Sequence, residues 1–302
     1  MARRGTTGDL IARLPSRARL AVPVLGAAGG VGASTVAALL AAQLHRMLPP
    51  PRALTVVDAA PAASSPWPES LSLVPPFGSS FLARRPQIDL LAKATARAQV
   101  AEGSILVLTD TNPPPARGPL SLDLDPELFH PYFAAQIQAL ILDAGTGEGP
   151  RLSAREQGGD PSLIERWLRF GLAVTGFVWV TSPHAASLRA SIAAVTRAER
   201  IGLSPSRWVI AVPLLHSGAM PRRARADLTL LADRVAAICP IEHRSDLHSD
   251  PAALATALNA PAAPDIVALA AEVLRAAGVP TAPRTPPGAH PQSAPIARKV
   301  TT

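Results

Sequence analysis

A glycine-rich segment, GAAGGVGAST (26–35), has the residue types and spacing of an anion-binding loop. Glycines allow positive φ angles and let the backbone approach a ligand closely. The segment leads from a short apolar run into a stretch of strong helix propensity, and consecutive N–H groups at the start of a helix bind phosphate. In phosphate-binding loops a hydroxyl in the place of Ser34 holds Mg²⁺. The segment therefore predicts a phosphate-binding loop, and the alternative is a tight strand-to-helix turn without a ligand.

The general pattern of such loops, G-x-x-x-x-G-K-[ST], fits this segment with two departures. When the pattern is aligned on Gly32, Ala27 stands in the place of the first glycine and Ala33 in the place of the lysine. The two lysines of the chain, Lys93 and Lys299, are remote in sequence, and no arginine lies between residues 20 and 45. A phosphate cation would therefore have to come from another segment or another chain.

Two aspartates, Asp58 and Asp143, each end an apolar run, ALTVVD and IQALILD respectively. Because ligands of parallel sheets bind at the carboxyl ends of the strands, these two strand ends and the glycine-rich segment are expected to meet. The loops expected there are 26–35, 58–61 and 143–147. Each aspartate is a candidate for chemistry, and the alternative for each is a helix cap or an ordinary strand-end residue.

Seven apolar runs have the length and residue types of buried strands. They are 20–25, 53–58, 105–110, 137–143, 174–181, 207–213 and 238–241. Helical patterns are expected over 33–47, 87–101, 161–170, 184–201, 221–237 and 264–277. Apolar strands that alternate with helices predict an α/β fold, with a parallel β-sheet of about seven strands and helices on both faces.

The net charge of +7 lies in the two ends of the chain. Residues 1–20 carry +4 and residues 279–302 carry +3, which leaves the body of the chain formally neutral. We expect a basic N-terminal arm over 1–19, one domain over 20–278, and a proline-rich, disordered tail over 279–302. A fold that is basic throughout is excluded, but the basic ends could contact DNA or an anionic membrane. The single cysteine, Cys239, fits a cytoplasmic location, and no apolar run is long enough for a membrane span.

The glycine-rich segment resembles the deviant Walker A loop of the ParA/MinD family of P-loop ATPases, whose pattern is K-G-G-x-G-K-[ST]-[ST]. Residues 28–35 match this pattern with alanine at both lysine positions, Ala28 and Ala33. Three further segments are similar to family segments: ALTVVDAAP (53–61), ILDAGTGEG (141–149, switch II) and VWVTSPHAASLRASIAAV (178–195). The resemblance covers roughly residues 20–278 and implies a P-loop NTPase fold, ATP and Mg²⁺ as cofactors, and a homodimer with protein partners. The missing P-loop lysine makes the chain most similar to the CpaE/TadZ-type, septum-site-determining-like branch.

The resemblance also assigns roles to positions. Nucleotide would be bound by Gly29, Gly30, Val31, Gly32, Ala33, Ser34 and Thr35. Ser34, Asp58 and Asp143 would hold Mg²⁺, and the two aspartates are the catalytic candidates. Ala60 stands where the family has a second acidic residue linked to the attacking water, and Val212-Pro213 stands where an asparagine often reads adenine. With two cations and one carboxylate lost, efficient hydrolysis is not expected, and nucleotide affinity is expected to be weak or lost.

Three functions follow from this resemblance. The first is a nucleotide-binding protein or pseudo-ATPase that acts as a positioning or assembly factor for a pilus, a secretion machine, a septum or a pole. The second is an active ATPase switch in plasmid or chromosome partition or in conjugative transfer. The third is a structural scaffold that has lost nucleotide. Each would be cytoplasmic, with peripheral membrane contact left open, and whether the chain is an enzyme stays open as well.

Two other groups of residues could carry chemistry. The loop EHRSDLHSD (242–250) holds histidines and aspartates that suit a metal, although a solvated loop is the favoured interpretation. Arg222, Arg223 and Arg225 cluster near the start of an expected helix, as a solvated face or as a contact for DNA or a partner. Whether the inserted residues 61–135 cover the phosphate loop is not determined by the sequence.

Overall fold

Nine strands form one sheet in the part of the chain that the computed structural model describes. The described residues are 19–48, 51–59, 65–72, 95–109, 137–146, 148–169, 174–214, 220–247 and 252–279. In order across the sheet the strands are β3 (Ala96–Val100), β4 (Gly103–Leu108), β2 (Leu54–Asp58), β5 (Ala139–Asp143), β1 (Leu20–Gly26), β7 (Phe177–Val180), β8 (Trp208–Pro213) and β9 (Ala237–Ile241), with β6 (Val174–Thr175) also paired to β1. The pairs are parallel apart from the antiparallel hairpin β3–β4.

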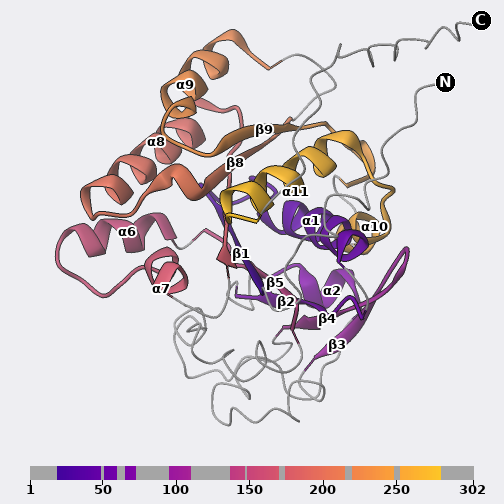
Figure 1. Cartoon of the computed structure of the whole chain (residues 1–302). Coiled ribbons are helices and arrows are strands. Elements are labelled where there is room, and N and C mark those ends of the chain that lie inside the picture. Colours follow the sequence, from indigo (N-terminus) through magenta and orange to yellow (C-terminus); the bar gives the residue numbers. More distant parts are fainter. Residues whose placement is uncertain are drawn as a thin grey trace, which may run out of the picture.

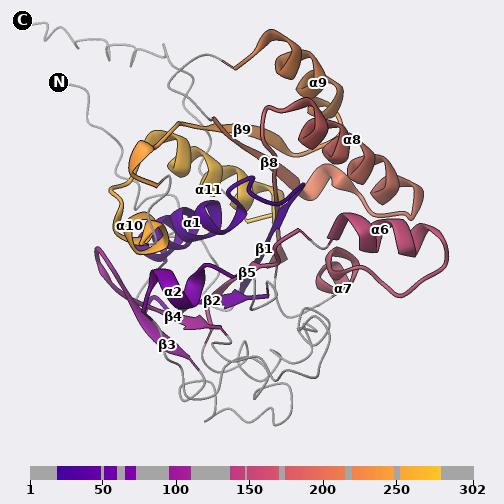
Figure 2. The ribbon, with the colours of Figure 1, turned by 180° about the vertical axis from the view of Figure 1, so that it is seen from behind.

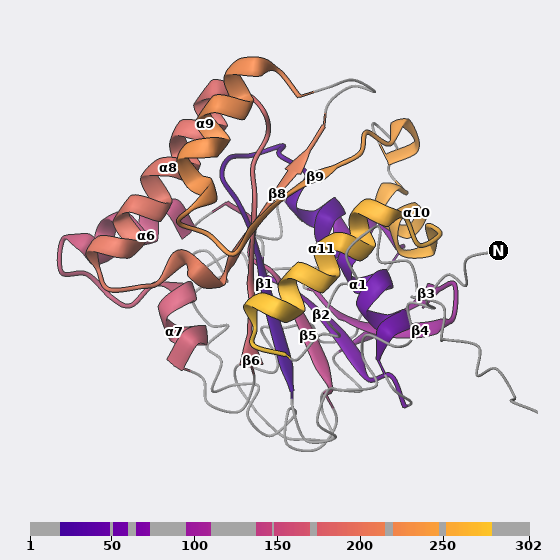
Figure 3. The same ribbon diagram turned by 45° about the horizontal axis from the view of Figure 1, so that its top comes forward.

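Helices cover both faces of this sheet (Figure 1). On one face lie α1 (Ala33–Met47), α10 (Ala253–Asn259) and α11 (Pro264–Ala276). On the other face lie α6 (Glu148–Glu156), α7 (Leu163–Arg169), α8 (Ala185–Arg200) and α9 (Arg222–Ala232). Figure 3 shows the strands between these two layers, and the short helix α2 (Trp67–Ser70) contacts α10 (Figure 2).

The three central strands β1, β2 and β5 are buried along their whole length, as strands covered on both faces must be. Alternate residues of β1 enter two separate apolar clusters, because side chains alternate across a sheet. Val22 and Val24 belong to the cluster that includes α1, α10 and α11, whereas Ala21 and Leu25 belong to the cluster that includes α8 and α9. The sheet is therefore the rigid base from which the loops at its carboxyl edge project.

The expected α/β fold, with a largely parallel sheet and helices on both faces, is confirmed. A strand lies in each of the seven expected runs, and α1 spans the expected residues. The expected strand 174–181 is divided at Gly176, where an added Cβ would lie 2.8 Å from the Val273 carbonyl oxygen of α11. The terminal arm and tail and most of the 61–135 insertion lie outside the described residues, so the expectations for them stay untested.

Two expectations about single elements are wrong, and three short helices are additional to those expected. Residues 96–100 of the expected helix 87–101 form β3, because Arg97 and Gln99 are exposed while Ala98 and Val100 are buried, which is the period of a strand. Helix α9 ends at Ala232, since the chain must turn before β9 begins. Helices α2, α6 and α10 were not expected. In α2 and α6 a proline lies near the helix start, where its missing N–H costs nothing.

None of the described helices is on its own long and apolar enough to cross a membrane. Helices α10 and α11 pass the length and composition test together, but they are bent by 81° to each other. Their apolar residues, which include Leu254 and Leu269, are buried in the core beside α1. Their hydrophobicity is therefore explained by packing against the sheet.

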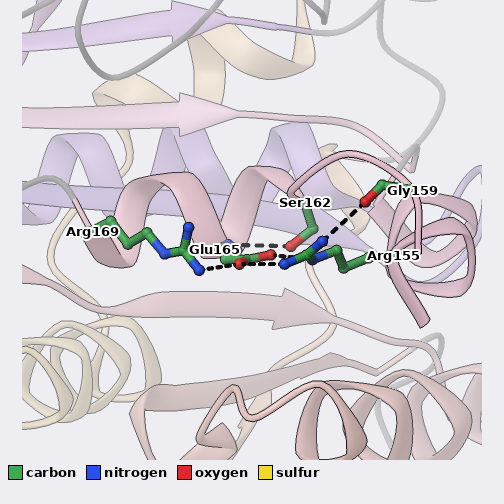
Figure 4. A network of polar contacts seen from close by, with 5 residues as sticks. All are labelled: Arg155, Gly159, Ser162, Glu165 and Arg169. Atoms are coloured by element: carbon green, nitrogen blue, oxygen red, sulfur yellow. Dashed lines mark hydrogen bonds and ion pairs between the residues drawn. The ribbon is translucent and has the colours of Figure 1, made fainter. Parts of the chain in front are cut away.

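A buried carboxylate joins α6 to α7 (Figure 4). Glu165 is 4% exposed and accepts hydrogen bonds from Arg155 Nε at 3.0 Å and Nη2 at 3.3 Å, and from Arg169. Its own N–H donates to the Ser162 hydroxyl at 3.2 Å, which caps the start of α7. Arg155 also donates to the Gly159 carbonyl, so one carboxylate orders the connection between the two helices.

Substitution Glu165→Gln should lower the free energy of unfolding by about 1–3 kcal/mol, because it removes the charge that two guanidinium groups share in a buried position. The matched control is Glu272→Gln, whose exposed pair with Arg275 should contribute less than about 1 kcal/mol. Urea denaturation of both variants measures the difference. Equal losses in the two variants would contradict this role of Glu165.

Candidate functional site

The glycine-rich segment lies at the carboxyl end of β1 and leads directly into α1. Gly30 and Gly32 have φ angles of 74° and 84°, in the left-handed region that favours glycine. Gly32 is the N-cap of α1, and the Val36 N–H donates to its carbonyl oxygen at 2.9 Å. The conformation is thus a strand, a left-handed glycine turn and a helix start, as a phosphate-binding loop requires.

The middle of this loop is open to solvent. Ala28, Gly29 and Gly30 are exposed, and an added Cβ at Gly29 would meet no heavy atom within 4 Å. Within the described part of the chain, no backbone carbonyl accepts a hydrogen bond from the N–H groups of residues 28–35. N–H groups at the start of a helix have no partner inside it. The loop therefore offers a row of donors to an anion.

Two backbone hydrogen bonds hold the first part of the loop against neighbouring strand ends. The Gly26 N–H donates to the Gly145 carbonyl at 2.8 Å, and the Ala27 N–H donates to the Val180 carbonyl at 2.9 Å. A Cβ at Gly26 would lie 3.1 Å from Thr146 Cγ2 and 3.2 Å from Val31 Cγ2. The loop after β1 and the loop after β5 therefore approach so closely that a methyl group at position 26 would require its neighbours to move by a few tenths of an ångström.

Asp143 ends β5 and its side chain is fully buried. Its Oδ2 accepts a hydrogen bond from Trp67 Nε1 at 2.8 Å, and the Gly145 N–H lies 3.4 Å from Oδ1. The Ser34 hydroxyl of α1 also donates to this carboxylate. Burial raises the pKa of Asp143 above its ordinary value, while the hydrogen bonds from Ser34, Trp67 and Gly145 act in the opposite direction.

Asp58 ends β2 and lies beside Asp143, its partner in the β2–β5 register. Its side chain is 5% exposed. Its Oδ2 accepts hydrogen bonds from the Ser65 and Thr109 hydroxyls, each at 2.5 Å. The structure therefore brings Ser34, Asp58 and Asp143 together, as the sequence predicted.

Whether these residues suit Mg²⁺ follows from the donors around them. Mg²⁺ requires six oxygen ligands in a near-ideal octahedron and keeps several waters, so it needs carboxylate lone pairs that are free. Here the Oδ2 atoms of both aspartates accept from protein groups, and the Ser34 hydroxyl donates to Asp143. No group of three or more His, Cys, Asp or Glu side chains that could hold a metal occurs among the described residues. The donors already bound at both Oδ2 atoms disfavour a hydrated Mg²⁺ at these oxygens, and the Mg²⁺ site stays an untested prediction.

The two alanines at the family's lysine positions differ in exposure. Ala28 is exposed at the loop surface, whereas Ala33 is buried at the first position of α1 and belongs to the apolar core. Ala60 lies outside the described residues. The loop thus has the backbone of a phosphate site. At the position of the pattern's lysine it has the methyl group of Ala33, which packs in the apolar core.

Trp67, Ser65 and Thr109 are site residues that the sequence did not predict. The rule that strand ends meet at one edge of a parallel sheet could have indicated Thr109, because it follows the strand beside β2. Ser65 and Trp67 lie in a proline- and serine-rich stretch for which the sequence predicts neither a helix nor a strand. A tryptophan in such a stretch was the one available signal that the segment returns to the core.

The other candidate groups lie apart from this arrangement. Arg244 pairs with Asp265 at the start of α11, with Nη2 2.8 Å from Oδ1, and Asp265 also accepts from the Glu242 N–H. This pair fixes the described part of the 242–250 loop, residues 242–247, which supports a structural role. Arg222, Arg223 and Arg225 are exposed on α9, which leaves both interpretations of that helix open.

Substitution Gly26→Ala should destabilise the chain by about 1–3 kcal/mol, because the added methyl group overpacks the contact with Thr146 and Val31. The control is Gly29→Ala, where the added methyl group meets open space and the change should stay within about 0.5 kcal/mol. Thermal or urea unfolding measures both. A neutral Gly26→Ala would mean that the two loops do not approach as closely as described.

Substitution Asp143→Asn should become more stabilising as pH rises. The raised pKa of Asp143 means that its contribution to stability is present below its unfolded pKa and is lost as pH rises through the folded pKa. The difference in unfolding free energy between Asp143→Asn and wild type should therefore be more positive at about pH 8 than at about pH 4, with a slope of at most about 1.4 kcal/mol per pH unit. Urea denaturation across this range measures it. A difference that does not change across this pH range would contradict the raised pKa of Asp143.

The comparisons with known proteins concern the fold. No protein-family model matches the sequence, and no curated protein matches it either. Solved structures match it over most of its length. A ParA family ATPase from Chlorobium tepidum TLS has 15% identity and a TM-score of 0.53, with 87% of this chain and 98% of that chain covered. The MinC:MinD cell division protein complex of Aquifex aeolicus has 14% identity and a TM-score of 0.55, with 88% and 98% covered.

A third similar structure is that of a Cyanothece McdA variant in complex with ATP. It has 15% identity and a TM-score of 0.55, with 89% of this chain and all of that chain covered. At these identities the likeness concerns the path of the backbone. The chain therefore has the fold of the ParA and MinD ATPases.

Proposed function

We propose that this chain is a ParA/MinD-like nucleotide-binding protein with little or no ATPase activity, which acts as a positioning or assembly factor in a larger machine. The observation that carries the proposal is the phosphate loop itself. It retains the left-handed glycines and the row of N–H donors, but alanine replaces both lysines.

Binding is supported by groups that need no lysine. The N–H groups of residues 28–35, which donate to no described backbone carbonyl, and the positive end of the α1 dipole suit a phosphate. The Cyanothece McdA structure in complex with ATP has the same overall fold. Without a cation, and with Val212-Pro213 in place of a base-reading asparagine, the affinity is expected to be modest.

Loss of hydrolysis follows from the groups that are missing. Catalysis of phosphoryl transfer consists almost entirely of positioning and of electrostatic stabilisation by cations. Removal of one such donor commonly costs about 10²–10³ in rate. Here the two lysines and the acidic residue at position 60 are all alanine, so a turnover that drives a conformational cycle is not expected.

The role in the cell is assigned by the resemblance to the CpaE/TadZ branch, in which such proteins serve pilus assembly and polar or septal positioning. We place the chain in the cytoplasm, as a homodimer that recruits protein partners. The similar fold of MinD, whose solved complex contains MinC, supports a partner-binding function. Contact of the basic ends with DNA or anionic membrane belongs to the same proposal.

A charge placed in the loop tests nucleotide binding. A saturating ligand that binds only the folded chain raises the unfolding temperature, so ADP and ATP should stabilise the wild type in a thermal-shift titration. Gly29→Asp adds a carboxylate at an open position and should weaken the apparent affinity at least about tenfold, whereas the uncharged isostere Gly29→Asn should retain most of it.

Phosphate release measured on the same samples should not exceed that of a protein-free control. Steady ATP hydrolysis that Gly29→Asp abolishes would favour the active ATPase switch instead. If neither nucleotide shifts the wild type at millimolar concentration, the nucleotide-free scaffold is the correct function and the present proposal is wrong.

A further inference from the structure

Trp67 contacts the site from a segment that the sequence did not connect with it. Its side chain is fully buried, and its Nε1 donates to Asp143 Oδ2 at 2.8 Å across 76 positions of the chain. An indole N–H is a donor only, so it cannot take the place of a metal ligand or accept from a metal-bound water. Because the ring is buried, this donor has a fixed direction.

The same segment also contacts the second carboxylate. The Ser65 hydroxyl donates to Asp58 Oδ2 at 2.5 Å, and the Trp67 N–H is 3.2 Å from the Ser65 oxygen. Residues 65–67 thus lie across the ends of both β2 and β5, whose last residues are register partners. Thr109 donates to Asp58 from the other side.

Protein groups donate hydrogen bonds to both aspartates. Asp58 accepts from two hydroxyls, and Asp143 accepts from an indole, a hydroxyl and a backbone N–H. A hydrated Mg²⁺ would present waters to these same oxygens. At Asp143 Oδ2 such a water would compete with the Trp67 indole N–H, whose ring is fully buried and whose N–H dipole would oppose a cation at this oxygen.

We propose that Trp67 takes the place of the hydrated metal in this site, so that the segment after β2 is tied to the end of β5 permanently and phosphate-bearing ligands bind without Mg²⁺. In P-loop proteins that use Mg²⁺, metal and ligand bring the corresponding segments together. Here one hydrogen bond does so in the ligand-free chain. That phosphate-bearing ligands bind without Mg²⁺ rests on the proposed function. The hydrogen bond from Trp67 to Asp143, called the tie below, does not depend on it.

The tie can be observed without any nucleotide through the indole N–H signals of tryptophan-labelled protein. The chain has four tryptophans, which provide internal references. Trp179 Nε1 donates to Ser191 at 3.0 Å, and Trp208 Nε1 is buried without a hydrogen-bond partner in the described part of the chain. Single phenylalanine substitutions assign the signals, and if Trp67→Phe does not fold, its signal follows from the other three.

The Trp67 indole N–H should exchange with D₂O as slowly as that of Trp179, and its chemical shift should be the same in EDTA, in millimolar MgCl₂ and in MgADP. A signal that shifts with Mg²⁺, broadens with it or exchanges rapidly would show that the metal displaces the indole, and the inference would be overturned.

The ligand statement is tested by thermal shift with ADP in EDTA and in MgCl₂. The wild type should give equal shifts in both, and Trp67→Phe should show a larger shift in MgCl₂ than in EDTA, while Trp208→Phe behaves like wild type. A wild-type shift that vanishes in EDTA would overturn the inference and leave the proposed function intact. If no shift occurs in either buffer, the proposed function fails, and the N–H signal alone decides whether the tie exists.

Discussion

The Asp143 carboxylate is fully buried at the end of β5, and the way in which it is satisfied determines what this site can do. An ionised carboxylate out of water needs either a counter-ion or several hydrogen bonds. The two lysines of the chain lie outside the described residues, and the donors that are described come from α1, from α2 and from the loop after β5. Two of these segments, α1 and α2, are distant from Asp143 in sequence and converge on this one strand end. The geometry of the glycine-rich loop depends on the same convergence, because Gly26 is bonded to Gly145 directly beside it.

The chemistry of the loop separates into two parts with different requirements. The backbone of residues 28–35 offers N–H groups and a helix dipole to an anion, and neither depends on a lysine at position 28 or 33. Acceleration of phosphoryl transfer requires cations and a positioned water, and alanine stands at the three positions, 28, 33 and 60, where the ParA/MinD pattern has its two lysines and its second acidic residue. Ala33 is buried in the core, so the alanine at the lysine position contributes to the packing of α1. Such a protein can bind a nucleotide without hydrolysing it, which suits the proposed role as a positioning factor.

The strands and the meeting of the two aspartates with the glycine-rich loop were predictable, because they depend on local sequence pattern and on one rule of parallel sheets. Apolar runs predicted the strands, and the rule that strand ends converge brought Asp58 and Asp143 to the glycine-rich loop. The tie from Trp67 was not predictable, since it spans 76 positions and depends on how a proline- and serine-rich stretch returns to the core. Strand β3 was missed because ARAQV also has helix-forming residues, and only pairing with β4 decides its conformation. The protein partner that a positioning function requires depends on a second molecule, so no pattern in this chain identifies it.

We propose above all that the glycine-rich loop binds nucleotide through its backbone and without a metal. Isothermal titration of ADP into the full-length chain in EDTA tests this claim most directly, with Gly29→Asp and Gly29→Asn titrated alongside. The account predicts saturable binding by the wild type and by Gly29→Asn, and its loss in Gly29→Asp. Absence of binding to the wild type in EDTA, or binding that the added carboxylate leaves unchanged, would contradict it.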